Sequence, residues 1–246
     1  MRTLVAVPTY FEADNIDRLL RRVRAAVEDA DVIVVDDGST DGTCEIVDRL
    51  ADELGRIRLE RRSHKSGLGD AYRHAFRIGL AEGYDLLVEI DADLSHDPDA
   101  LAEMLSAAHA GADVVIGSRY VPGGRIVGWS RSRTILSRWG NRYASIVLGL
   151  AINDATAGFR VYRSSIVRRF GLDGIRASGY GFQVEMTYRA VRHGARIVEI
   201  PIVFRERESG QSKMSRKIVL EAFALVTAWG LRDLIAGERS HRMYDE

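Results

Sequence analysis

Two aspartates, Asp91 and Asp93, flank Ala92 directly after an apolar run that ends at Ile90. Carboxylates two residues apart can share one hard divalent cation, Mg²⁺ or Mn²⁺, and bind a diphosphate through it. Without a cation the two negative charges would repel each other, so a metal would stabilise the pair. An Asp-x-Asp pattern at an arbitrary position is more often a capped turn. Its place at the end of a predicted strand favours the metal site.

A second acidic pair, Asp36 and Asp37, follows the apolar run 32–35. No base or thiol is adjacent to this pair, so we expect it to accept hydrogen bonds from a base or a ribose rather than to act as a nucleophile. The alternative is an Asx-turn that begins the next helix. Both roles are compatible if one carboxylate caps the turn and the other faces a ligand.

Cationic side chains in glycine-containing loops are the candidate phosphate ligands. Arg119 comes soon after the apolar run 114–116, and a guanidinium can bind phosphate oxygens through two hydrogen bonds. Arg207 and Lys213 flank Gly210 in a similar loop. The alternative for each is an ordinary solvated loop.

Charge is balanced over the whole chain, with 35 basic and 35 acidic residues, so composition gives no reason to expect a nucleic-acid partner. The distribution of charged residues along the chain is uneven. Residues 78–118 contain nine acids and no Lys or Arg, whereas 114–153 contain six arginines and no acid. This asymmetry suits a cation site beside a phosphate-binding loop, although two solvated faces would give the same pattern.

The elements that must position these residues alternate along the first half of the chain. Apolar runs at 4–7, 32–35, 57–59, 84–90 and 114–116 predict strands, and helical periodicity lies between them. This order predicts an α/β fold: a Rossmann-like, doubly wound, mostly parallel sheet flanked by helices, with ligands at the carboxyl ends of its strands. Pro8 is expected to end the first strand, and Asp14 or Asn15 to cap the first helix.

The second half is less regular, and no domain boundary is visible in it. Helices are predicted at 131–150 and 182–193, and one strand at 197–204. We therefore expect a single domain over 1–235, followed by a polar tail at 236–246.

Cys44 is the only cysteine, which excludes an internal disulfide and indicates a reducing compartment. No run approaches the roughly 18 apolar residues of a membrane span, and no N-terminal signal precedes the first strand. We expect a cytoplasmic protein that is either soluble or peripheral to a membrane.

The motifs in this order resemble those of the family 2 glycosyltransferases with the GT-A fold, and more narrowly the polyprenol-phosphate (dolichol-phosphate) mannosyltransferases. The resemblance covers nearly the whole chain. The general family motifs are VPTYFEADNI at 7–16, VVDDGSTDGT at 34–43 and DADLSHDP at 91–98. The more specific ones are GSRYVPGG at 117–124, DATAGFRVYR at 154–163, GYGFQVEM at 179–186 and IPIVFRERESGQSKMS at 200–215.

The resemblance implies a nucleotide-sugar donor, GDP-mannose, and a role for each matching residue. The nucleoside would contact Pro8, Tyr10, Glu12, Val35 and Asp37. The diphosphate and a divalent metal would be held by Asp91, Ala92 and Asp93, with Ser95 near the cation. Donor and acceptor phosphates would contact Arg119, Arg207 and Lys213, and the lipid phosphate would meet Arg133, with Arg131 as its substitute.

The implied reaction transfers mannose to the phosphate of a polyprenol phosphate with inversion, and gives polyprenyl β-mannosyl phosphate and GDP. Its catalytic residues would be Asp93, Arg119 and Arg133. The alternatives are a UDP-glucose-dependent polyprenyl-phosphate glucosyltransferase and a non-catalytic nucleotide-sugar-binding subunit.

The isoprenoid tail of such an acceptor requires an apolar surface at the cytoplasmic face of a membrane. The acid-free segment 114–153 is one candidate for this surface, and residues 218–231 are another. A separate membrane subunit is a further expected partner. In the acid-free segment the apolar residues are Ile135, Leu136, Trp139, Tyr143, Ile146, Val147 and Leu148.

Overall fold

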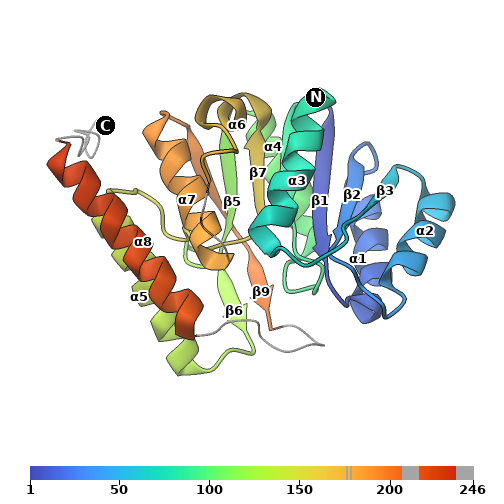
Figure 1. The fold of residues 1–246 in the computed structure, drawn as a ribbon, viewed down its shortest axis with the longest axis horizontal. Coiled ribbons are helices and arrows are strands. Elements are labelled where there is room, and N and C mark those ends of the chain that lie inside the picture. The colour runs from blue at the N-terminus through green and yellow to red at the C-terminus, as the bar shows by residue number, and fades with distance from the viewer. Residues whose placement is uncertain (176, 178, 207–215, 237–246) are drawn as a thin grey trace.

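A seven-stranded sheet with the order β3-β2-β1-β4-β7-β5-β8 forms the centre of the molecule (Figure 1). The computed structural model describes residues 1–236 except 176, 178 and 207–215. The strands are β1 (Thr3–Thr9), β2 (Asp31–Asp36), β3 (Ile57–Arg61), β4 (Leu86–Glu89), β5 (Val114–Ser118), β7 (Arg160–Arg163) and β8 (Ile197–Pro201). Strand β7 is antiparallel to both of its neighbours, and the other pairings are parallel. The predicted mostly parallel α/β sheet is confirmed.

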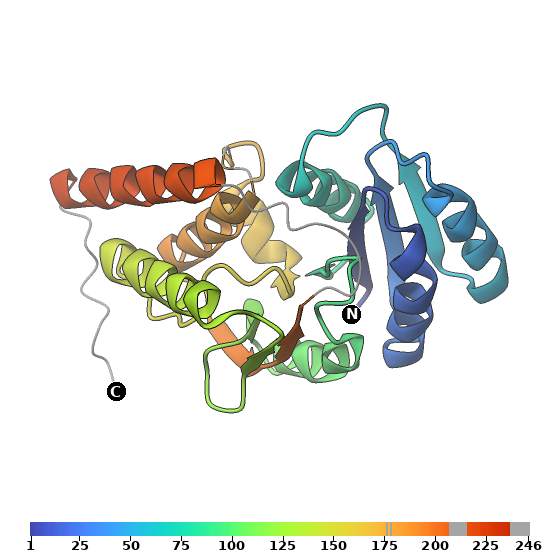
Figure 2. The same cartoon turned by 90° about the horizontal axis from the view of Figure 1, so that it is seen from below.

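Helices cover both faces of this sheet. On one face lie α1 (Ala13–Ala26), α2 (Thr43–Leu54) and α4 (Leu101–His109), which follows a single 3-10 turn at Pro98–Ala100. On the other face lie α3 (Leu68–Ala81), α6 (Ser164–Phe170) and α7 (Gly179–Arg192). A separate pair of short strands, β6 (Arg125–Val127) and β9 (Val203–Arg205), extends from the main sheet. The helices α5 (Arg131–Leu148) and α8 (Arg216–Ile235) lie beyond one end of the sheet (Figures 1 and 2).

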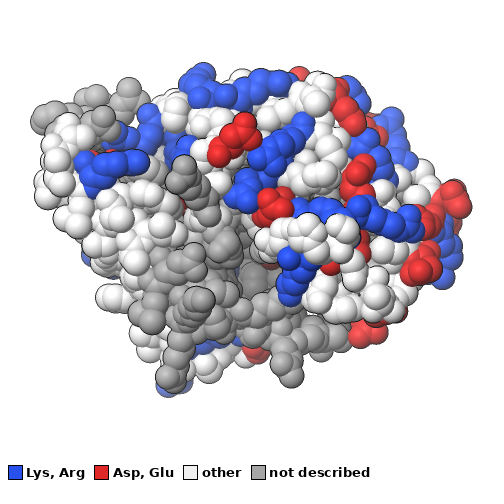
Figure 3. All heavy atoms as spheres, in the orientation of Figure 1, with Lys and Arg blue, Asp and Glu red and all other residues white. Residues whose placement is uncertain are grey.

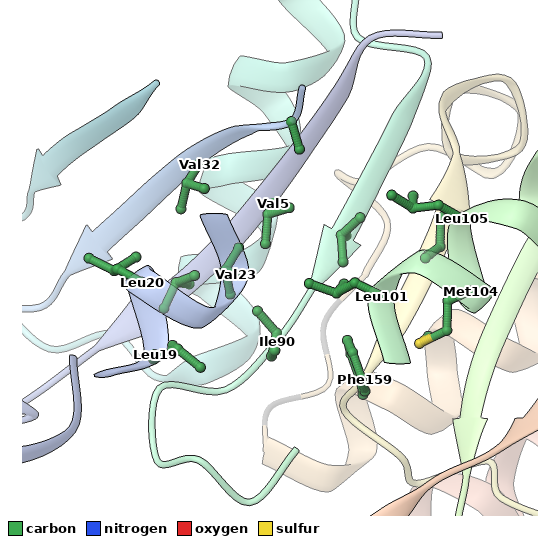
Figure 4. Close-up of a cluster of buried hydrophobic side chains, with 14 of the residues drawn as sticks. Val5, Leu19, Leu20, Val23, Val32, Ile90, Leu101, Met104, Leu105 and Phe159 are labelled. Carbon is green, nitrogen blue, oxygen red and sulfur yellow. The ribbon is translucent and has the colours of Figure 1, made fainter. Parts of the chain in front are cut away.

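The core follows the alternation of side chains along each strand. Val5 and Val7 face α1 and α4, whereas Leu4 and Ala6 face α3. Figure 4 shows the first of these clusters, in which apolar side chains from α1 and α4 pack against β1 and β2. Because both of their faces are buried, strands β1, β2, β4 and β5 each contain a continuous apolar run.

The first strand does not end at Pro8, contrary to expectation. Strand β1 continues to Thr9, with Pro8 paired to Val35 of β2. On the side of β1 that faces β4, the last hydrogen bond of the ladder runs from the amide of Ile90 to the carbonyl of Ala6. Pro8 lies two residues further on and faces the same side, where β4 has already ended, so its missing N–H interrupts no ladder.

Two further expectations about element boundaries were wrong. Helix α1 begins at Ala13 after Glu12, without a side-chain cap, so neither Asp14 nor Asn15 is its N-cap. The single strand predicted at 197–204 is divided between two sheets. Strand β8 follows β5 as far as Ser118, where β5 turns away, and the chain then pairs with β6.

Within the described residues, no helix has the length and apolar composition needed to cross a bilayer. The predicted polar tail lies outside the described residues except for Ala236.

Candidate active site

Three segments that carry acidic or aromatic side chains meet at the carboxyl edge of the sheet, as the alternation of strands and helices predicts. They follow β1, β2 and β4, which are neighbours in the sheet. Thr9 at the end of β1 is paired with Asp36 at the end of β2. Parallel strands place their carboxyl ends together, so residues distant in sequence converge here.

The two carboxylates of the second acidic pair have different roles. Asp36 accepts hydrogen bonds from the amides of Gly38 and Ser39, at 3.0 and 2.8 Å, and therefore closes the turn. Asp37 instead forms an ion pair with Arg62, whose Nε lies 2.8 Å from Oδ1. Asp36 therefore has the turn role, and the binding of a base or ribose by Asp37 stays a prediction. Arg62 was not predicted, because nothing in its local sequence distinguishes it.

Aromatic rings border this edge next to the Asp36 turn. The Lys65 ammonium lies 4.0 Å from the centre of the Tyr10 ring, and the Phe11 ring lies 4.3 Å from that of Tyr10. Phe11 has a positive φ of 58° and is 47 % exposed. Its strained backbone is held by a 2.8 Å hydrogen bond from its amide to the Ser39 hydroxyl. An exposed ring fixed in this way can stack on a planar ligand.

The other residues predicted for the nucleoside lie nearby but differ in accessibility. Glu12 precedes α1 and accepts a 3.0 Å hydrogen bond from the Asn15 side chain. Pro8 is partly buried at the end of β1. Val35 is fully buried in the core, in the same cluster as Tyr72.

The Asp-x-Asp pair lies where the chain leaves β4. The Tyr72 hydroxyl donates a 2.9 Å hydrogen bond to Oδ1 of Asp91. Asp93 is 6 % exposed and accepts a 3.1 Å hydrogen bond from the amide of Ser95 and another from its hydroxyl. Ser95 therefore orients Asp93, and Tyr72, which sequence analysis missed, orients Asp91. Ala92 between them is buried.

A hard divalent cation fits this donor set. The ligands are carboxylate oxygens, which Mg²⁺ and Mn²⁺ prefer. His96 does not neutralise the pair: burial lowers its pKa to about 4, so the ring is uncharged at neutral pH although its Nδ1 lies 3.9 Å from Asp91. The described residues contain no cluster of three or more His, Cys, Asp or Glu suited to a metal. A cation here would thus need further oxygen ligands from a substrate.

Buried polar side chains surround Glu89, the last residue of β4, two residues before Asp91. Burial raises the pKa of Glu89 to about 8, and Gln183 of α7 donates a 2.8 Å hydrogen bond to it. Arg160 is fully buried beside it and donates to the carbonyls of Ala155 and Ala157, each at 2.7 Å. Sequence analysis assigned no role to these residues.

Arg119 is buried in an ion pair at the start of the basic segment. Its Nε and Nη2 donate to the two carboxylate oxygens of Asp154 at 2.7 and 2.6 Å, and its amide donates to Asp154 at 3.0 Å. Although burial raises the pKa of Asp154, the charge and hydrogen bonds of Arg119 lower it below its ordinary value on balance. Thr156 accepts a further 2.8 Å bond from Arg119. Asp154 and Thr156 were missed as site residues, although DATAGFRVYR contains both.

The Trp129 ring lies beside two guanidinium groups. Cζ of Arg133 is 4.0 Å from the ring centre, and that of Arg119 is 5.6 Å from it. Arg133 also forms a 2.8 Å ion pair with Glu206. Arg131 is exposed at the first position of α5.

Two N–H groups at the contact of Trp129 with Arg133 have no hydrogen-bond acceptor among the described residues. Nε1 of Trp129 and Nε of Arg133 are buried and bond to nothing among the described residues. A buried N–H without an acceptor costs about 1–3 kcal/mol, so such donors usually bond to water, an ion or another ligand. Two unsatisfied N–H groups beside two guanidiniums form a site suited to an anion. Trp129 was not predicted as a site residue. The other predicted phosphate ligands, Arg207 and Lys213, lie outside the described residues.

Comparison with known proteins agrees with this arrangement. The family description "Glycosyl transferase family 2" matches residues 4–171. A Micrococcus luteus protein named undecaprenyl-phosphate mannosyltransferase is 52 % identical over 231 residues, 94 % of this chain and 95 % of its own. A Mycolicibacterium smegmatis protein named polyprenol monophosphomannose synthase is 46 % identical over 232 residues, 94 % of this chain and 88 % of its own.

Solved structures confirm the fold. Glucosyl-3-phosphoglycerate synthase from Mycobacterium tuberculosis in complex with UDP has a TM-score of 0.69 and 17 % identity, and the match covers 93 % of this chain and 80 % of that one. The same enzyme with Mn²⁺, UDP and glucosyl-3-phosphoglycerate has a TM-score of 0.63 and 17 % identity, with 96 % and 79 % covered. Because the family description matches residues 4–171 and both relatives cover most of its length, the chain belongs to glycosyl transferase family 2.

Proposed function

We propose that the protein transfers mannose from GDP-mannose to the phosphate of a polyprenol phosphate, with inversion, and releases GDP. One observation carries the proposal: a carboxylate pair suited to a cation and a diphosphate is connected, through the rings of His96 and Phe204, to unsatisfied donors at Trp129 and Arg133 suited to a second phosphate. Two anion sites are what a transfer between two phosphates requires. The names of the two curated relatives support mannose and a polyprenol phosphate as the transferred sugar and the acceptor.

On the donor side, Asp91 and Asp93 would hold Mg²⁺ or Mn²⁺ together with the diphosphate. The cation would supply positive charge to the departing nucleoside diphosphate. Ser95 and Tyr72 hold the two carboxylates in place through the hydrogen bonds described above. Asp37 and the Tyr10–Phe11 pair would bind the nucleoside, with Pro8, Glu12 and Val35 shaping the pocket around it.

On the acceptor side, Arg133 and Trp129 would bind the lipid phosphate, and Arg119, held in place by Asp154, would contact the donor and acceptor phosphates. Arg131 would supply a further charge at the start of α5, and Arg207 and Lys213 would contribute to phosphate binding. The N-terminus of α5, where the Ser130 hydroxyl caps the amide of Arg133, also favours an anion through the helix dipole.

The chemistry requires no strong base. A phosphate monoester is largely ionised at neutral pH, so its oxygen attacks the anomeric carbon directly. The bond from that carbon to the diphosphate oxygen breaks as the new carbon–oxygen bond forms on the opposite face, which inverts the configuration. The electron pair leaves with GDP, and no proton must be removed. The protein's task is therefore to position two anions in line and to offset their charge.

The test is transfer of radiolabel from GDP-mannose to a short polyprenyl phosphate, with UDP-glucose as a parallel donor. We expect label in the lipid phase from GDP-mannose, in the presence of Mg²⁺ or Mn²⁺ and not in excess EDTA. Transfer from UDP-glucose only would replace the proposed donor. Absence of transfer from both donors, with nucleotide binding retained, would contradict the proposed activity.

Arg133→Ala is expected to raise the KM for the acceptor by roughly tenfold to a hundredfold, because it removes a charged donor worth about 1.5–3 kcal/mol. The KM for GDP-mannose should change little, since Arg133 lies beside Trp129 and Glu206 rather than beside the Asp-x-Asp pair. Arg142→Ala, an exposed arginine on the same helix, is the matched control. An equal rise in both KM values would remove the assignment of Arg133 to the lipid phosphate.

Trp129→Phe tests the unsatisfied donor. The substitution keeps an aromatic ring beside Arg133 but removes Nε1–H, which has no acceptor among the described residues. We expect the acceptor KM to rise about fivefold, the effect of one neutral hydrogen bond of about 1 kcal/mol. The free energy of unfolding without substrate should not fall, because no bond within the protein is lost. A lower stability with an unchanged acceptor KM would show that Trp129 is purely structural.

A further inference from the structure

Helix α5 reverses the usual arrangement of a surface helix. Large apolar side chains such as Ile135 and Trp139 are exposed, whereas the first residue of the helix to be buried is Asn141, which is 2 % exposed. No apolar residue of α5 before Ala144 is buried. The described surface over the neighbouring α8, at the left of Figure 3, is likewise largely uncharged. A surface helix ordinarily turns its apolar side to the core, so the half of α5 that carries Arg133 must be held by other contacts.

Three polar side chains hold this half of the helix. They are Arg133, Ser137 and Asn141, and we call them the polar row of α5. They lie four residues apart, so they follow one another along one side of the helix. Nη1 of Arg133 lies 2.8 Å from a carboxylate oxygen of Glu206. The hydroxyl of Ser137 accepts a 2.7 Å hydrogen bond from the hydroxyl of Tyr120.

The buried amide of Asn141 uses both its nitrogen and its oxygen. Its Nδ2 donates to the carbonyl of Ser137 and to the hydroxyl of Thr156, both at 3.0 Å, and its Oδ1 accepts a 3.1 Å bond from the amide of Thr156. The Thr156 hydroxyl also accepts a 2.8 Å bond from Nη2 of Arg119 and donates to Asp154. The nitrogens of Asn141 and Arg119 can only donate, so the hydroxyl proton is left for Asp154. One hydroxyl thus connects α5 to Arg119.

Each contact of the polar row reaches a segment that carries an expected phosphate ligand. Thr156 bonds to Arg119, Tyr120 follows Arg119 in the chain, and Glu206 immediately precedes Arg207. Hydrogen bonds are directional and hold donor and acceptor within a narrow range of distances. Apolar contacts have no preferred direction. The polar row therefore fixes the position of α5 relative to Arg119 more closely than apolar packing would.

We propose that the polar row is a positioning device that sets the distance between Arg133 at the acceptor site and Arg119. The inference rests on the proposed function, in which the attacking phosphate must lie in line with the departing diphosphate. A displacement of about 1 Å can lower the rate of such a reaction about a hundredfold. Ser137 and Asn141 are positioning residues: they act through Arg133 and Arg119 and touch no substrate.

The experiment compares Asn141→Ala with Leu150→Ala in mannosyl transfer, in unfolding temperature and in hydrogen exchange. Leu150 is buried just beyond α5, in the apolar cluster at the far end of the helix, and lies outside the polar row. For Asn141→Ala we expect a kcat about tenfold to a hundredfold below that of the wild type, with the KM for GDP-mannose within about twofold. Leu150→Ala should lower the unfolding temperature, because it leaves a cavity, but keep a kcat near that of the wild type.

Two milder variants serve if Asn141→Ala does not fold. Tyr120→Phe and Ser137→Ala each break the single hydrogen bond between these two hydroxyls. Each should lower kcat about fivefold, the effect of one neutral hydrogen bond. The double variant should lose no more than either single one, because both remove the same bond. Ser145→Ala is the matched control, since its hydroxyl bonds to the carbonyl of Ile152 away from the polar row, and it should keep the wild-type kcat.

Two results would overturn the proposal. One is a fall in kcat for Asn141→Ala no larger than that for Leu150→Ala, and the other is a KM for GDP-mannose that rises as kcat falls. If the wild type transfers no mannose, the proposed function fails, and hydrogen exchange decides on the polar row alone. Amides of residues 131–141 should then exchange faster in Asn141→Ala and not in Leu150→Ala. Unchanged exchange in this segment would show that the polar row does not hold the helix.

Discussion

Asp93→Asn is expected to lower mannosyl transfer by about a thousandfold or more, the effect of removing one charged ligand from a site that stabilises a departing diphosphate. Asparagine has the same shape and keeps an oxygen that can accept the bonds from the amide and hydroxyl of Ser95. The substitution therefore removes charge and leaves the local hydrogen bonds. Asp93→Ala should abolish transfer, because it also leaves the donors of Ser95 unpaired.

The measurement compares turnover, Mn²⁺-dependent binding of GDP, and the unfolding temperature. For Asp93→Asn we expect turnover and metal-dependent binding to fall together while the unfolding temperature stays near that of the wild type. Asp99→Asn is the control, because this carboxylate is 74 % exposed and pairs with Arg22 away from the site. Wild-type turnover by Asp93→Asn would contradict the assignment of a cation to Asp91 and Asp93.

Asp154→Ala is expected to lower the free energy of unfolding by about 3–5 kcal/mol, the cost of leaving one member of a buried ion pair without its partner. Asp154 is fully buried and accepts three hydrogen bonds from Arg119, which is itself 5 % exposed. Urea unfolding, followed by circular dichroism, measures the change. As a control, Asp173→Ala removes an exposed partner of Arg77 and should change stability by less than about 1 kcal/mol.

The same ion pair predicts a pH dependence. Because the pKa of Asp154 is lowered in the folded state, its contribution to stability is complete above the ordinary value of 3.8 and is lost as the pH falls through the lowered value. Asp154→Asn should therefore flatten the acid limb of the stability curve below about pH 4. If Asp154→Ala does not fold, Thr156→Val removes the hydrogen bonds of one hydroxyl with Arg119, Asn141 and Asp154 and should cost about 1–3 kcal/mol. A stability near that of the wild type in Asp154→Ala would show that Arg119 is satisfied without this carboxylate.

The amino-acid sequence by itself determined the main architecture and the place of the donor site. Apolar runs of three or four residues between helical periods indicate a buried parallel sheet, because strands covered on both faces are apolar at successive positions. Once β1, β2 and β4 are parallel neighbours, Asp37 and the pair Asp91 and Asp93 must lie at one edge. The family motifs then supply the chemistry for these positions.

Local sequence was insufficient where long-range pairing decides the structure. Strand β7 is short, begins and ends with arginine, and runs antiparallel between β4 and β5. Its pattern gives no strand signal, because its stability comes from two neighbouring strands rather than from its own residues. Pro8 shows the same limit, since the effect of a proline depends on whether a partner strand lies on its N–H side.

Only the tertiary structure decided which side chains complete each site. Tyr72, Asp154 and Trp129 are separated by 19, 35 and 4 residues from the predicted site residues that they contact, Asp91, Arg119 and Arg133. A hydrogen bond or ring contact of this kind requires two groups to meet within a few ångströms, which sequence spacing does not specify. Helices α5 and α8 illustrate the same point. The sequence shows two apolar helices, but their packing determines which apolar side chains are buried and which remain exposed.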